Sequence, residues 1–483
     1  MPPRVAIVGA GIGGLAAADH LLRRTAGRGL PVDVAVFESS DRAGGVLATE
    51  TYEGTLLERG PDTLVTHKPA GLALCERLGF SDRIVYPESG HVEILDRGRL
   101  LPLPAGFAFL APTRWGPLLS SPLLSWRGKL RALAEPLLPA RRPTGEDDVE
   151  SVASFVRRRF GGELYARLSE PVVGGIAMAD VETLSVAANF PRLLKREQEP
   201  GRVSGGWRKR PAPAGPKARE AAGPGRGLAP QIATLSGGLG QIVEALVEAL
   251  PPGALRSNLP VRAVRRARAG FELDLPGGER FAADAVLLAV PAHAAAPLLA
   301  DLAPPLAEDL RRISYASCVT VNLAWPRAAV ARPPRGHGFF VPASAGLPVV
   351  AATFVNVKFP ERVPGDQIVA RVFLGGALHP DAVERSDDDL LDLAERTMKP
   401  LLGLSRPPAW SRIWRHPLAI PQRSMGYLAI AARLAERLDE HPGLAFAGGP
   451  SGAYGLPDSI AAGEAAAERL LVQIGETGKP GAP

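Results

Sequence analysis

Three glycines near the start of the chain have the spacing of a phosphate-binding turn. The apolar residues 5–8 predict a strand, Gly9, Gly11 and Gly14 follow it, and the next residues have helical spacing. Gly9 permits a tight turn, Gly11 leaves room for a pyrophosphate, and Gly14 lets the helix pack closely on the sheet. The free N–H groups and positive dipole end of that helix would face the phosphates. The residues expected to bind an adenine dinucleotide here are Gly9, Ala10, Gly11, Ile12, Gly13 and Gly14.

An acidic residue ends the second expected strand, residues 34–37, and suits the ribose of such a cofactor. The carboxylate of Glu38 can accept hydrogen bonds from both ribose hydroxyls, and its charge disfavours a 2′-phosphate. Glu38 lies farther from the glycines than the usual spacing of about 20 residues, because a Gly/Pro-rich loop at residues 25–31 comes between. Glu38 and its neighbour Ser39 are therefore predicted to bind the ribose.

A second glycine pair distinguishes a flavin from a nicotinamide cofactor. Residues 41–45 read DRAGG, and residues 57–61 read LERGP. Together they resemble the (E/D)xxxRxGG…ExGP pattern of the flavin amine oxidase and protoporphyrinogen oxidase superfamily. The resemblance implies FAD, with Arg42 near the pyrophosphate and Gly45 beneath the flavin. The further cofactor contacts that it implies are Gly60, Pro61, Asp62 and Thr63.

Four stretches between residues 181 and 422 indicate which group of flavin enzymes the chain resembles. Residues 181–193 (VETLSVAANFPRL) closely resemble the LSxxAxFP motif of protoporphyrinogen oxidases, and residues 419–422 (AIPQ) resemble their IPQ segment. Residues 337–342 (HGFFVP) and 371–377 (RVFLGGA) resemble two further pieces of the same enzymes. The resemblance, which covers nearly the whole chain outside one loop, is to the oxygen-dependent protoporphyrinogen and coproporphyrinogen oxidases.

That resemblance implies an FAD-dependent oxidase that converts protoporphyrinogen IX to protoporphyrin IX with O2 in haem biosynthesis. Coproporphyrinogen III, giving coproporphyrin III, stays open as the substrate and would need more cationic partners for its extra carboxylates. An amine oxidase or a carotenoid desaturase is a rival within the flavoenzymes, weakened by the LSxxAxFP and IPQ motifs. A non-catalytic flavin- or tetrapyrrole-binding protein is the alternative outside the enzymes.

The implied reaction needs orientation more than reactive side chains. A porphyrinogen is electron-rich and primed to aromatise, so we assign no catalytic side chain and no metal. Aromatic walls suit a flat macrocycle, and a cation would pair with its carboxylates. Val92 stands where the resemblance places an arginine, so Arg97 or Arg99 would have to substitute. The predicted substrate-binding residues are Arg97, Arg99, Gly175, Phe339, Phe340, Phe354 and Phe373.

Distant segments are expected to complete the flavin site. Residues 235–250, followed by strands with a Gly-Gly hairpin turn, resemble the family's second FAD segment. Residues 444–471 resemble its last segment, which places a helix N-terminus, here near Asp458 and Ser459, at the flavin pyrimidine and ribityl chain. The family's flavin-proximal tryptophan is replaced by a histidine. The cofactor residues implied here are Val261, whose backbone faces adenine, His416, Gly448, Tyr454, Gly455 and Leu456.

These patterns predict an α/β fold with a Rossmann-type (GR2-like) FAD-binding domain, a mixed-sheet substrate domain and a helical subdomain. The FAD-binding domain is expected to comprise residues 1–75, 230–300 and 441–475, and the substrate domain residues 76–99, 176–195 and 301–440. The helical subdomain is placed at residues 100–175. Residues 196–229 are rich in Gly, Pro and charge, so we expect a mobile, solvated insertion there.

The helical subdomain has two readings, which are compatible. It is expected either to cover the active site or to touch a membrane surface peripherally. The candidates for membrane contact are Phe107, Trp115 and Trp126, with Arg114, Arg127 and Lys129 at the headgroups.

Composition and charge indicate the number of domains, the cellular compartment and the kind of partner. The 483 residues are 46% hydrophobic, which is enough for about two or three domains. Two cysteines, Cys75 and Cys318, exclude a disulfide framework and favour a reducing compartment, so we expect the cytoplasm, with peripheral contact at the inner face of the cell membrane. The net charge of +6 favours a polycarboxylate substrate or an anionic membrane. Nucleic acid is not expected as a partner, since no nucleic-acid-binding motif is present. A homodimer stays open.

Overall fold

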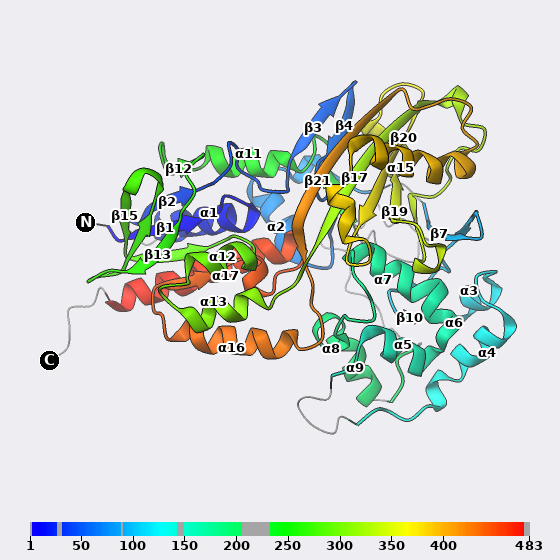
Figure 1. Cartoon of the computed structure of the whole chain (residues 1–483), viewed down its shortest axis with the longest axis horizontal. Helices are drawn as coiled ribbons and strands as arrows, with labels where there is room; N and C mark the ends of the chain where they lie inside the picture. Colours follow the sequence, from blue (N-terminus) through cyan, green and yellow to red (C-terminus); the bar gives the residue numbers. More distant parts are fainter. Residues whose placement is uncertain are drawn as a thin grey trace.

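The structure, a computed structural model, describes residues 2–26, 31–87, 90–142, 149–199, 201–204 and 232–477. Most of the predicted insertion at residues 196–229 lies outside the described residues. Figure 1 shows three regions: a parallel sheet between helices, a larger sheet beside it, and a group of helices next to the larger sheet.

The first region is built on a five-stranded sheet in which every neighbouring pair is parallel. Its order is β12-β2-β1-β16-β22, so strands from the beginning, the middle and the end of the chain lie side by side. These strands are short and mostly buried, as expected for a parallel sheet covered on both faces. Their bounds are β1 Arg4–Val8, β2 Asp33–Phe37, β12 Leu255–Arg256, β16 Ala285–Leu288 and β22 Leu444–Phe446.

Alternate residues of β1 enter two different cores, because successive side chains of a strand point to opposite faces. Val5 and Ile7 pack with α1, α11 and α17, whereas Ala6 and Val8 pack with α12, α13 and α16. The bounds of the helices around this sheet are α1 Ile12–Ala26, α2 Pro69–Arg77, α11 Gly240–Glu248, α12 Ala292–Leu298, α13 Pro304–Arg311, α16 Tyr427–Asp439 and α17 Leu456–Thr477.

A three-stranded antiparallel sheet packs on the same region and contains the expected Gly-Gly turn. Gly277 and Gly278 both have positive φ, at +76° and +81°, which glycine adopts readily. The bounds are β13 Ala263–Arg266, β14 Phe271–Asp274 and β15 Arg280–Ala283. Smaller sheets pair β3 Thr49–Tyr52 with β4 Thr55–Glu58, β11 Ile232–Leu235 with β5 Leu64–Val65 and β6 Ile84–Val85, and β9 Phe107–Ala108 with β10 Ala111–Pro112.

The second region is a seven-stranded mixed sheet with the order β21-β17-β20-β19-β18-β7-β8. Only the β18–β7 pair is parallel, and the other five pairs are antiparallel. α15 packs on one face through Leu390, Ala394 and Met398. The bounds are β7 Val92–Asp96, β8 Arg99–Pro102, β17 Tyr315–Pro326, β18 Gly338–Phe340, β19 Val349–Phe354, β20 Gln367–Gly375, β21 Trp410–Pro421, α14 Val355–Lys358 and α15 Asp387–Leu402.

The third region is a group of short helices around one hydrophobic core. α8 and α9, which lie in a segment assigned from the sequence to the substrate domain, also contribute Val186 and Leu193 to this core. None of the helices in the described ranges is both long and apolar enough to cross a bilayer. The bounds are α3 Trp115–Ser120, α4 Trp126–Leu133, α5 Val152–Phe160, α6 Gly162–Leu164, a π-helical turn Tyr165–Ser169, α7 Glu170–Ala177, α8 Val186–Asn189 and α9 Pro191–Gln198.

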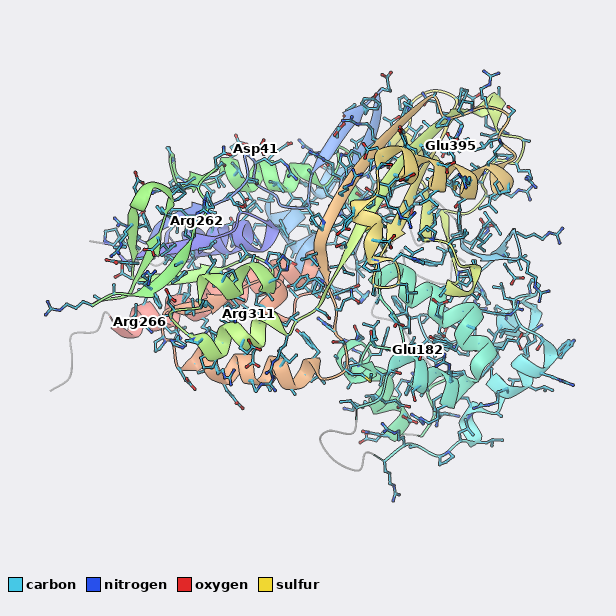
Figure 2. The ribbon with its side chains drawn as sticks, viewed as in Figure 1. Asp41, Glu182, Arg262, Arg266, Arg311 and Glu395 are labelled. Carbon is cyan, nitrogen blue, oxygen red and sulfur yellow. The ribbon has the colours of Figure 1, made fainter. Side chains whose placement is uncertain are left out.

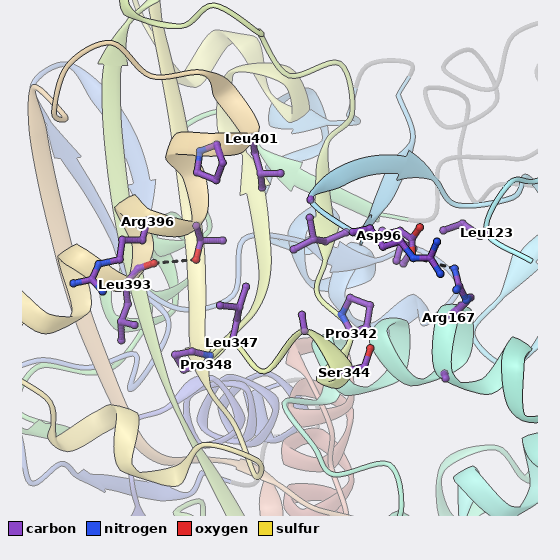
Figure 3. Close-up of a pocket in the computed structure, with 18 residues that line it drawn as sticks. Asp96, Leu123, Arg167, Pro342, Ser344, Leu347, Pro348, Leu393, Arg396 and Leu401 are labelled. Atoms are coloured by element: carbon purple, nitrogen blue, oxygen red, sulfur yellow. Dashed lines mark hydrogen bonds and ion pairs between the residues drawn. The ribbon is translucent and has the colours of Figure 1, made fainter.

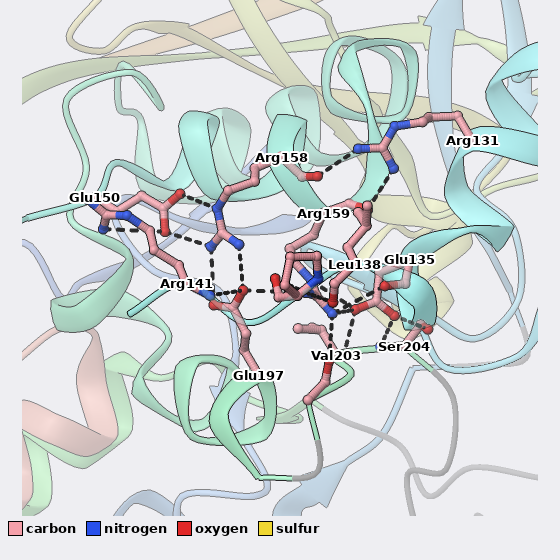
Figure 4. A network of polar contacts seen from close by, with 12 residues as sticks. Arg131, Glu135, Leu138, Arg141, Glu150, Arg158, Arg159, Glu197, Val203 and Ser204 are labelled. Atoms are coloured by element: carbon pink, nitrogen blue, oxygen red, sulfur yellow. Dashed lines mark hydrogen bonds and ion pairs between the residues drawn. The ribbon is translucent and has the colours of Figure 1, made fainter. Parts of the chain in front are cut away.

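Buried ion pairs join this helical region to its flanking segments (Figure 4). Arg159 of α5 and Glu135 are both fully buried and form an ion pair. Glu135 also accepts hydrogen bonds from the N–H groups of Val203, at 2.9 Å, and Ser204, at 3.1 Å. One carboxylate therefore fixes α5 and the chain that follows α9.

Candidate functional site

The glycine turn after β1 is closely packed but leaves open space in front of α1. Gly9 has φ +102°, and its N–H donates to the Phe37 carbonyl at 2.8 Å. A Cβ on Gly14 would lie 2.0 Å from the Gly9 oxygen, so only glycine allows this approach of helix and turn. A Cβ on Gly11 would meet nothing within 4 Å. The turn thus has both the tight geometry and the opening that a pyrophosphate requires.

The second glycine pair runs alongside this turn. The Gly44 N–H donates to the Ala10 carbonyl at 2.8 Å, and a Cβ on Gly45 would lie 3.7 Å from Gly11 Cα. The Arg42 guanidinium donates to the Gly45 carbonyl at 2.6 Å. Burial, and then repulsion from Arg59, lower the pKa of Arg42. A bound anion beside these two cations would relieve that repulsion.

Glu38 joins the predicted ribose site to the start of α1. Its Oε2 accepts the Ala10 N–H at 2.9 Å, and its Oε1 accepts the N–H of Ser40 at 2.9 Å. The Ser39 hydroxyl donates to the same carboxylate at 3.3 Å. The backbone carbonyl of Glu38 accepts from Leu259 N at 2.9 Å, which draws the loop before Val261 against this end of β2. Val261 itself is 9% exposed and packs into the core beneath β1 and β2.

A second helix N-terminus reaches the same place from the end of the chain. α17 begins at Leu456, two residues before the expected start, and Gly448 and Gly455 precede it with φ +68° and +82°. A Cβ on Gly13 would lie only 3.2 Å from the Ser459 oxygen, so the first turns of α1 and α17 are in contact. The Tyr454 N–H donates to Asp458 Oδ2 at 3.3 Å. Two helix N-termini side by side favour a negatively charged ligand.

A cavity of about 420 Å³ opens beside Gly45 and the strand β21. It brings together three predicted cofactor residues, Arg42, Gly45 and His416. It also adds residues that sequence reasoning missed, because no motif connects β21 with the segment after β4. The full lining is Arg42, Gly45, Val46, Arg59, Ile413, Trp414, Arg415, His416, Pro417 and Ala419.

His416 is held as a neutral imidazole at the wall of this cavity. Its Nε2 lies 2.8 Å from the Arg59 carbonyl oxygen, which only accepts, so Nε2 carries the hydrogen. Burial, and then the charge of Arg371, lower the pKa of His416 to about 4. At neutral pH its Nδ1 is therefore an acceptor.

The Gly60–Thr63 loop is fixed from behind by buried cations. The Arg371 guanidinium donates to the Gly60 carbonyl, and Lys358 Nζ lies 2.7 Å from Asp62 Oδ2. Burial alone would raise the pKa of the Asp62 carboxyl, but Lys358 and Arg371 offset this effect and hold the pKa well below its usual range. The Thr63 hydroxyl donates to Asp62 Oδ1 at 3.2 Å. The Asp62 side chain is thus committed to the protein, while Pro61 is partly exposed.

The predicted substrate residues fall into three different surroundings. Phe340 packs on Gly175, where an added Cβ would lie 2.4 Å from the ring. Phe373 is partly exposed, with the Arg371 guanidinium 4.9 Å from its ring centre. Phe339 and Phe354 are core residues, 1% and 0% exposed, that pack on each other with ring centres 6.0 Å apart. We therefore leave these last two out of the proposed substrate contacts.

Arg97 and Arg99 differ in what they face. Both belong to the turn and start of the β7–β8 hairpin and are exposed. Arg97 lines a cavity of about 700 Å³ that does not include His416, and β7 and β8 lie at the opposite edge of the mixed sheet from β21. Arg99 lines neither of these two cavities.

Glu170 is a titratable residue that sequence reasoning missed. It begins α7, directly after the π-helical turn, and accepts a hydrogen bond from Ala343 N at 3.1 Å. Burial raises the pKa of Glu170 to about 7. With Gly175, Met178 and His379 it lines a cavity of about 20 Å³, which has room for about one water. A cavity of this size does not hold a macrocycle.

The comparisons with known proteins agree with this geometry. The family profile of flavin-containing amine oxidoreductases matches residues 12–471. The chain belongs to the flavin-containing amine oxidoreductase family. As a family member it carries FAD, and the residues from Gly9 to Gly14, Glu38, Arg42 and the first turn of α17 fit that cofactor.

Individual relatives of this flavin-containing family member are similar over almost their full length. A coproporphyrinogen III oxidase of Propionibacterium freudenreichii is 34% identical, with 96% of this chain and 90% of the relative covered. A coproporphyrinogen III oxidase of Bacillus subtilis is 30% identical, with 97% and 98% covered. A crystal structure from Exiguobacterium sp. 255-15, provisionally named a protoporphyrinogen oxidase, has a TM-score of 0.82 and 27% identity, with 98% and 99% covered.

Proposed function

We propose that this flavoenzyme oxidises a porphyrinogen with O2 and that coproporphyrinogen III is its substrate. The observation that carries the proposal is the cavity beside Gly45, whose lining has Arg59 and Arg415 next to the cofactor candidate Arg42 and no carboxylate. Coproporphyrinogen has four propionates where protoporphyrinogen has two, so it gains more from cationic walls. The two relatives at 34% and 30% identity, both named coproporphyrinogen III oxidase, support the same choice.

Protoporphyrinogen IX, the substrate expected from the sequence, is the second candidate. The LSxxAxFP-like stretch at residues 181–193 and the name given to the Exiguobacterium structure favour it. The two substrates share one chemistry and differ only in their peripheral groups. The choice between them therefore rests on carboxylate recognition.

The chain supplies binding and orientation for this reaction. Bound FAD would supply the hydride acceptor for a substrate carbon, with O2 as the final oxidant. Arg371 and His416 fix the carbonyls of Gly60 and Arg59, so the loop that borders the cavity keeps its shape. Trp414, 7% exposed, closes the cavity floor and helps to exclude water. Glu170, with its pKa near 7, can exchange a proton beside Gly175 at neutral pH.

Turnover of the two porphyrinogens side by side tests the proposal. The purified FAD-loaded chain is given each substrate with O2, and the porphyrin formed is followed by fluorescence. We expect a kcat/KM for coproporphyrinogen III that is higher by about tenfold or more, as for one added charged hydrogen bond. A higher kcat/KM for protoporphyrinogen IX would identify that compound as the substrate. No fluorescence gain with either substrate, in a yellow protein, would leave a non-catalytic flavin protein.

A matched pair of arginines tests the role of the cavity. Arg59 has no ion pair among the described residues, whereas Arg415 pairs with Asp387 at 2.6 Å, outside the cavity lining. Arg59→Gln is expected to raise the KM for coproporphyrinogen III about tenfold, and Arg415→Gln is expected to raise it less. Equal increases in KM for the two variants would show that the charge of Arg59 in the cavity does not bind the substrate.

A further inference from the structure

A cavity of about 700 Å³ lies between the mixed sheet and the helical region. Figure 3 shows Leu393, Arg396 and Leu401 of α15 on one side and Asp96, Leu123 and Arg167 on the other. Pro342, Ser344, Leu347 and Pro348 form the wall between them. Its volume lies within the range of roughly 300–1,000 Å³ that is usual for small-molecule sites.

This cavity is separate from the one beside Gly45. The two have no lining residue in common. It does adjoin the small cavity beside Gly175, because Pro342 and Leu347 line both. A ligand here would therefore lie next to the candidate substrate region without occupying the place where the flavin contacts meet.

The cavity wall combines aliphatic side chains with an excess of positive charge. Its charged lining residues are three arginines and one aspartate. Asp96 is already paired with Arg167 at 3.0 Å. Arg396, whose side chain is 74% exposed, pairs with Asp392 one turn earlier on α15. Arg97 has no ion pair among the described residues, so its charge is free for a ligand.

The backbone at Arg97 adds a second observation. Arg97 and Gly98 have φ +49° and +77°, and they connect Asp96 to Arg99 as a two-residue hairpin turn. Turns with two positive φ values favour Asn, Asp or Gly at the first position, and a long side chain there costs about 1 kcal/mol. The turn therefore has an arginine at a position where Asn, Asp or Gly would be less strained, and this arginine lines the cavity.

We propose that this cavity binds a carboxylated porphyrin, the product of the reaction, outside the oxidation site. A flat apolar ring fits walls of leucine, isoleucine and proline, and its propionates pair with Arg97 and Arg396. Because Pro342 and Leu347 line both cavities, the product would move only a short distance from the region beside Gly175 into this cavity. The inference rests on the proposed function for its choice of ligand.

Equilibrium dialysis of the FAD-loaded protein against coproporphyrin III tests the second site. The wild type is expected to bind two equivalents. Arg396→Glu is expected to weaken one of them about tenfold or more, because a charge-assisted contact becomes a repulsion. Lys399→Glu makes the same charge reversal three residues later on α15, outside the cavity lining, and is expected to leave both equivalents intact.

Leu393→Trp provides a test that does not depend on charge, since the larger side chain fills the cavity from α15. It is expected to remove the same equivalent while the flavin spectrum stays unchanged. One equivalent in the wild type, or identical binding by Arg396→Glu and Lys399→Glu, overturns the inference. Because binding is measured with ready-made porphyrin, failure of this test with normal turnover rejects the second site alone. If the protein binds two equivalents of porphyrin but oxidises no porphyrinogen, the proposed function is rejected and the second site is retained.

Discussion

The Glu38 carboxylate holds together the part of the chain that is predicted to bind the ribose. It accepts the Ala10 N–H at the start of α1 and the Ser40 N–H beyond β2. Its Oε2 has one hydrogen bond among the described residues, so a further lone pair remains for a hydroxyl. A neutral amide would offer only one accepting oxygen.

Glu38→Gln is therefore expected to raise the Kd for FAD about tenfold or more, in keeping with the loss of a charged hydrogen bond. Titration of the apoprotein with FAD, followed by flavin fluorescence, measures it. Asp41→Asn is the control, since Asp41 is exposed only three residues away and lies at the periphery in Figure 2. An equal Kd for FAD in Glu38→Gln and the wild type would show that Glu38 does not bind the cofactor.

Glu170 makes the stability of the protein depend on pH. Burial raises its pKa from 4.5 to about 7, so between these values the folded state holds a proton that the unfolded state has released. The free energy of unfolding therefore falls as the pH rises from about 4.5 to about 7. Glu170→Gln is expected to lose this fall, which thermal melts at pH 5 and pH 8 would measure. A pH dependence identical to that of the wild type would contradict the assignment.

Sequence reasoning reached some of these residues and missed others for identifiable reasons. Gly9, Gly11 and Glu38 lie in one local strand-turn-helix unit, so their spacing alone predicts their geometry. Lys358 contacts Asp62 from 296 residues farther along the chain, and Arg371 approaches from farther still. Both are charged residues, so the sequence did not indicate that they would be buried. Phe339 and Phe354 have the residue type of a ring-binding wall, but neighbouring strands bury them completely.

At the level of elements, α5 is anchored by one buried guanidinium. Arg159 and Glu135 are 0% exposed, and Arg159 also donates to the Leu138 carbonyl at 3.0 Å. Two residues earlier, Arg157 forms an ion pair with Glu182 that is nearly half exposed. Buried pairs that lose one partner leave an uncompensated charge, whereas exposed pairs contribute little.

Arg159→Met is expected to lower the free energy of unfolding by about 3 kcal/mol or more. Arg157→Met is expected to lower it by less than about 1 kcal/mol. Urea denaturation of both variants measures the difference. Similar midpoints would show that the Glu135 pair does not anchor the helical region.

The helix α4 carries an apolar stripe that faces solvent. Trp126 and Leu130, one turn apart on α4, are 71% and 64% exposed, and Leu137, 85% exposed, follows in the 3-10 turn Glu135–Leu137. Of the residues expected at a membrane surface, Phe107 and Trp115 are partly buried against the helical core. Lys129 is 7% exposed, with its ammonium 4.8 Å from the Trp126 ring centre. Arg114 and Arg127 are exposed. We propose that this stripe makes the peripheral membrane contact.

Replacing Trp126 and Leu130 together by serine is expected to reduce co-sedimentation with phosphatidylglycerol vesicles about tenfold or more, from the apolar area lost. Val472→Ser is the control, because Val472 is an exposed apolar residue on α17, away from the stripe. Undiminished vesicle binding by the double variant would exclude the stripe as the contact.

Across the whole molecule, the candidate cofactor site comprises three distant parts of the chain. The phosphate turn follows β1, the loop before Val261 packs on Glu38, and the first turn of α17 contacts Gly13. Each part resembles a known segment, so the sequence predicts the parallel sheet that joins them. The pairing of β7 with β18, in contrast, has no local signal, because it depends on contacts across the mixed sheet.

Removal of FAD is expected to destabilise all three parts together. A ligand that binds only the folded state at a thousand times its Kd adds about 4 kcal/mol to the free energy of unfolding. The apoprotein should therefore melt several degrees below the FAD-loaded protein, and the added cofactor should restore the Tm. Equal melting of the two forms would mean that the cofactor does not bridge the three parts.

Charged side chains lie on all three regions of the fold. Figure 2 labels Arg262, Arg266 and Arg311, all exposed, on the parallel-sheet region, and Glu182 and Glu395 on the other regions. No group of three His, Cys, Asp or Glu side chains in the described ranges is arranged to hold a metal ion.

The late position of β22 and α17 in the chain has a consequence for biosynthesis. Translation has to reach Leu456 before the second helix terminus exists, so a nascent polypeptide still on the ribosome has only part of the flavin cradle. Acquisition of the yellow colour then reports that synthesis has passed the final helix. Prematurely terminated products would stay colourless and be left to proteolysis.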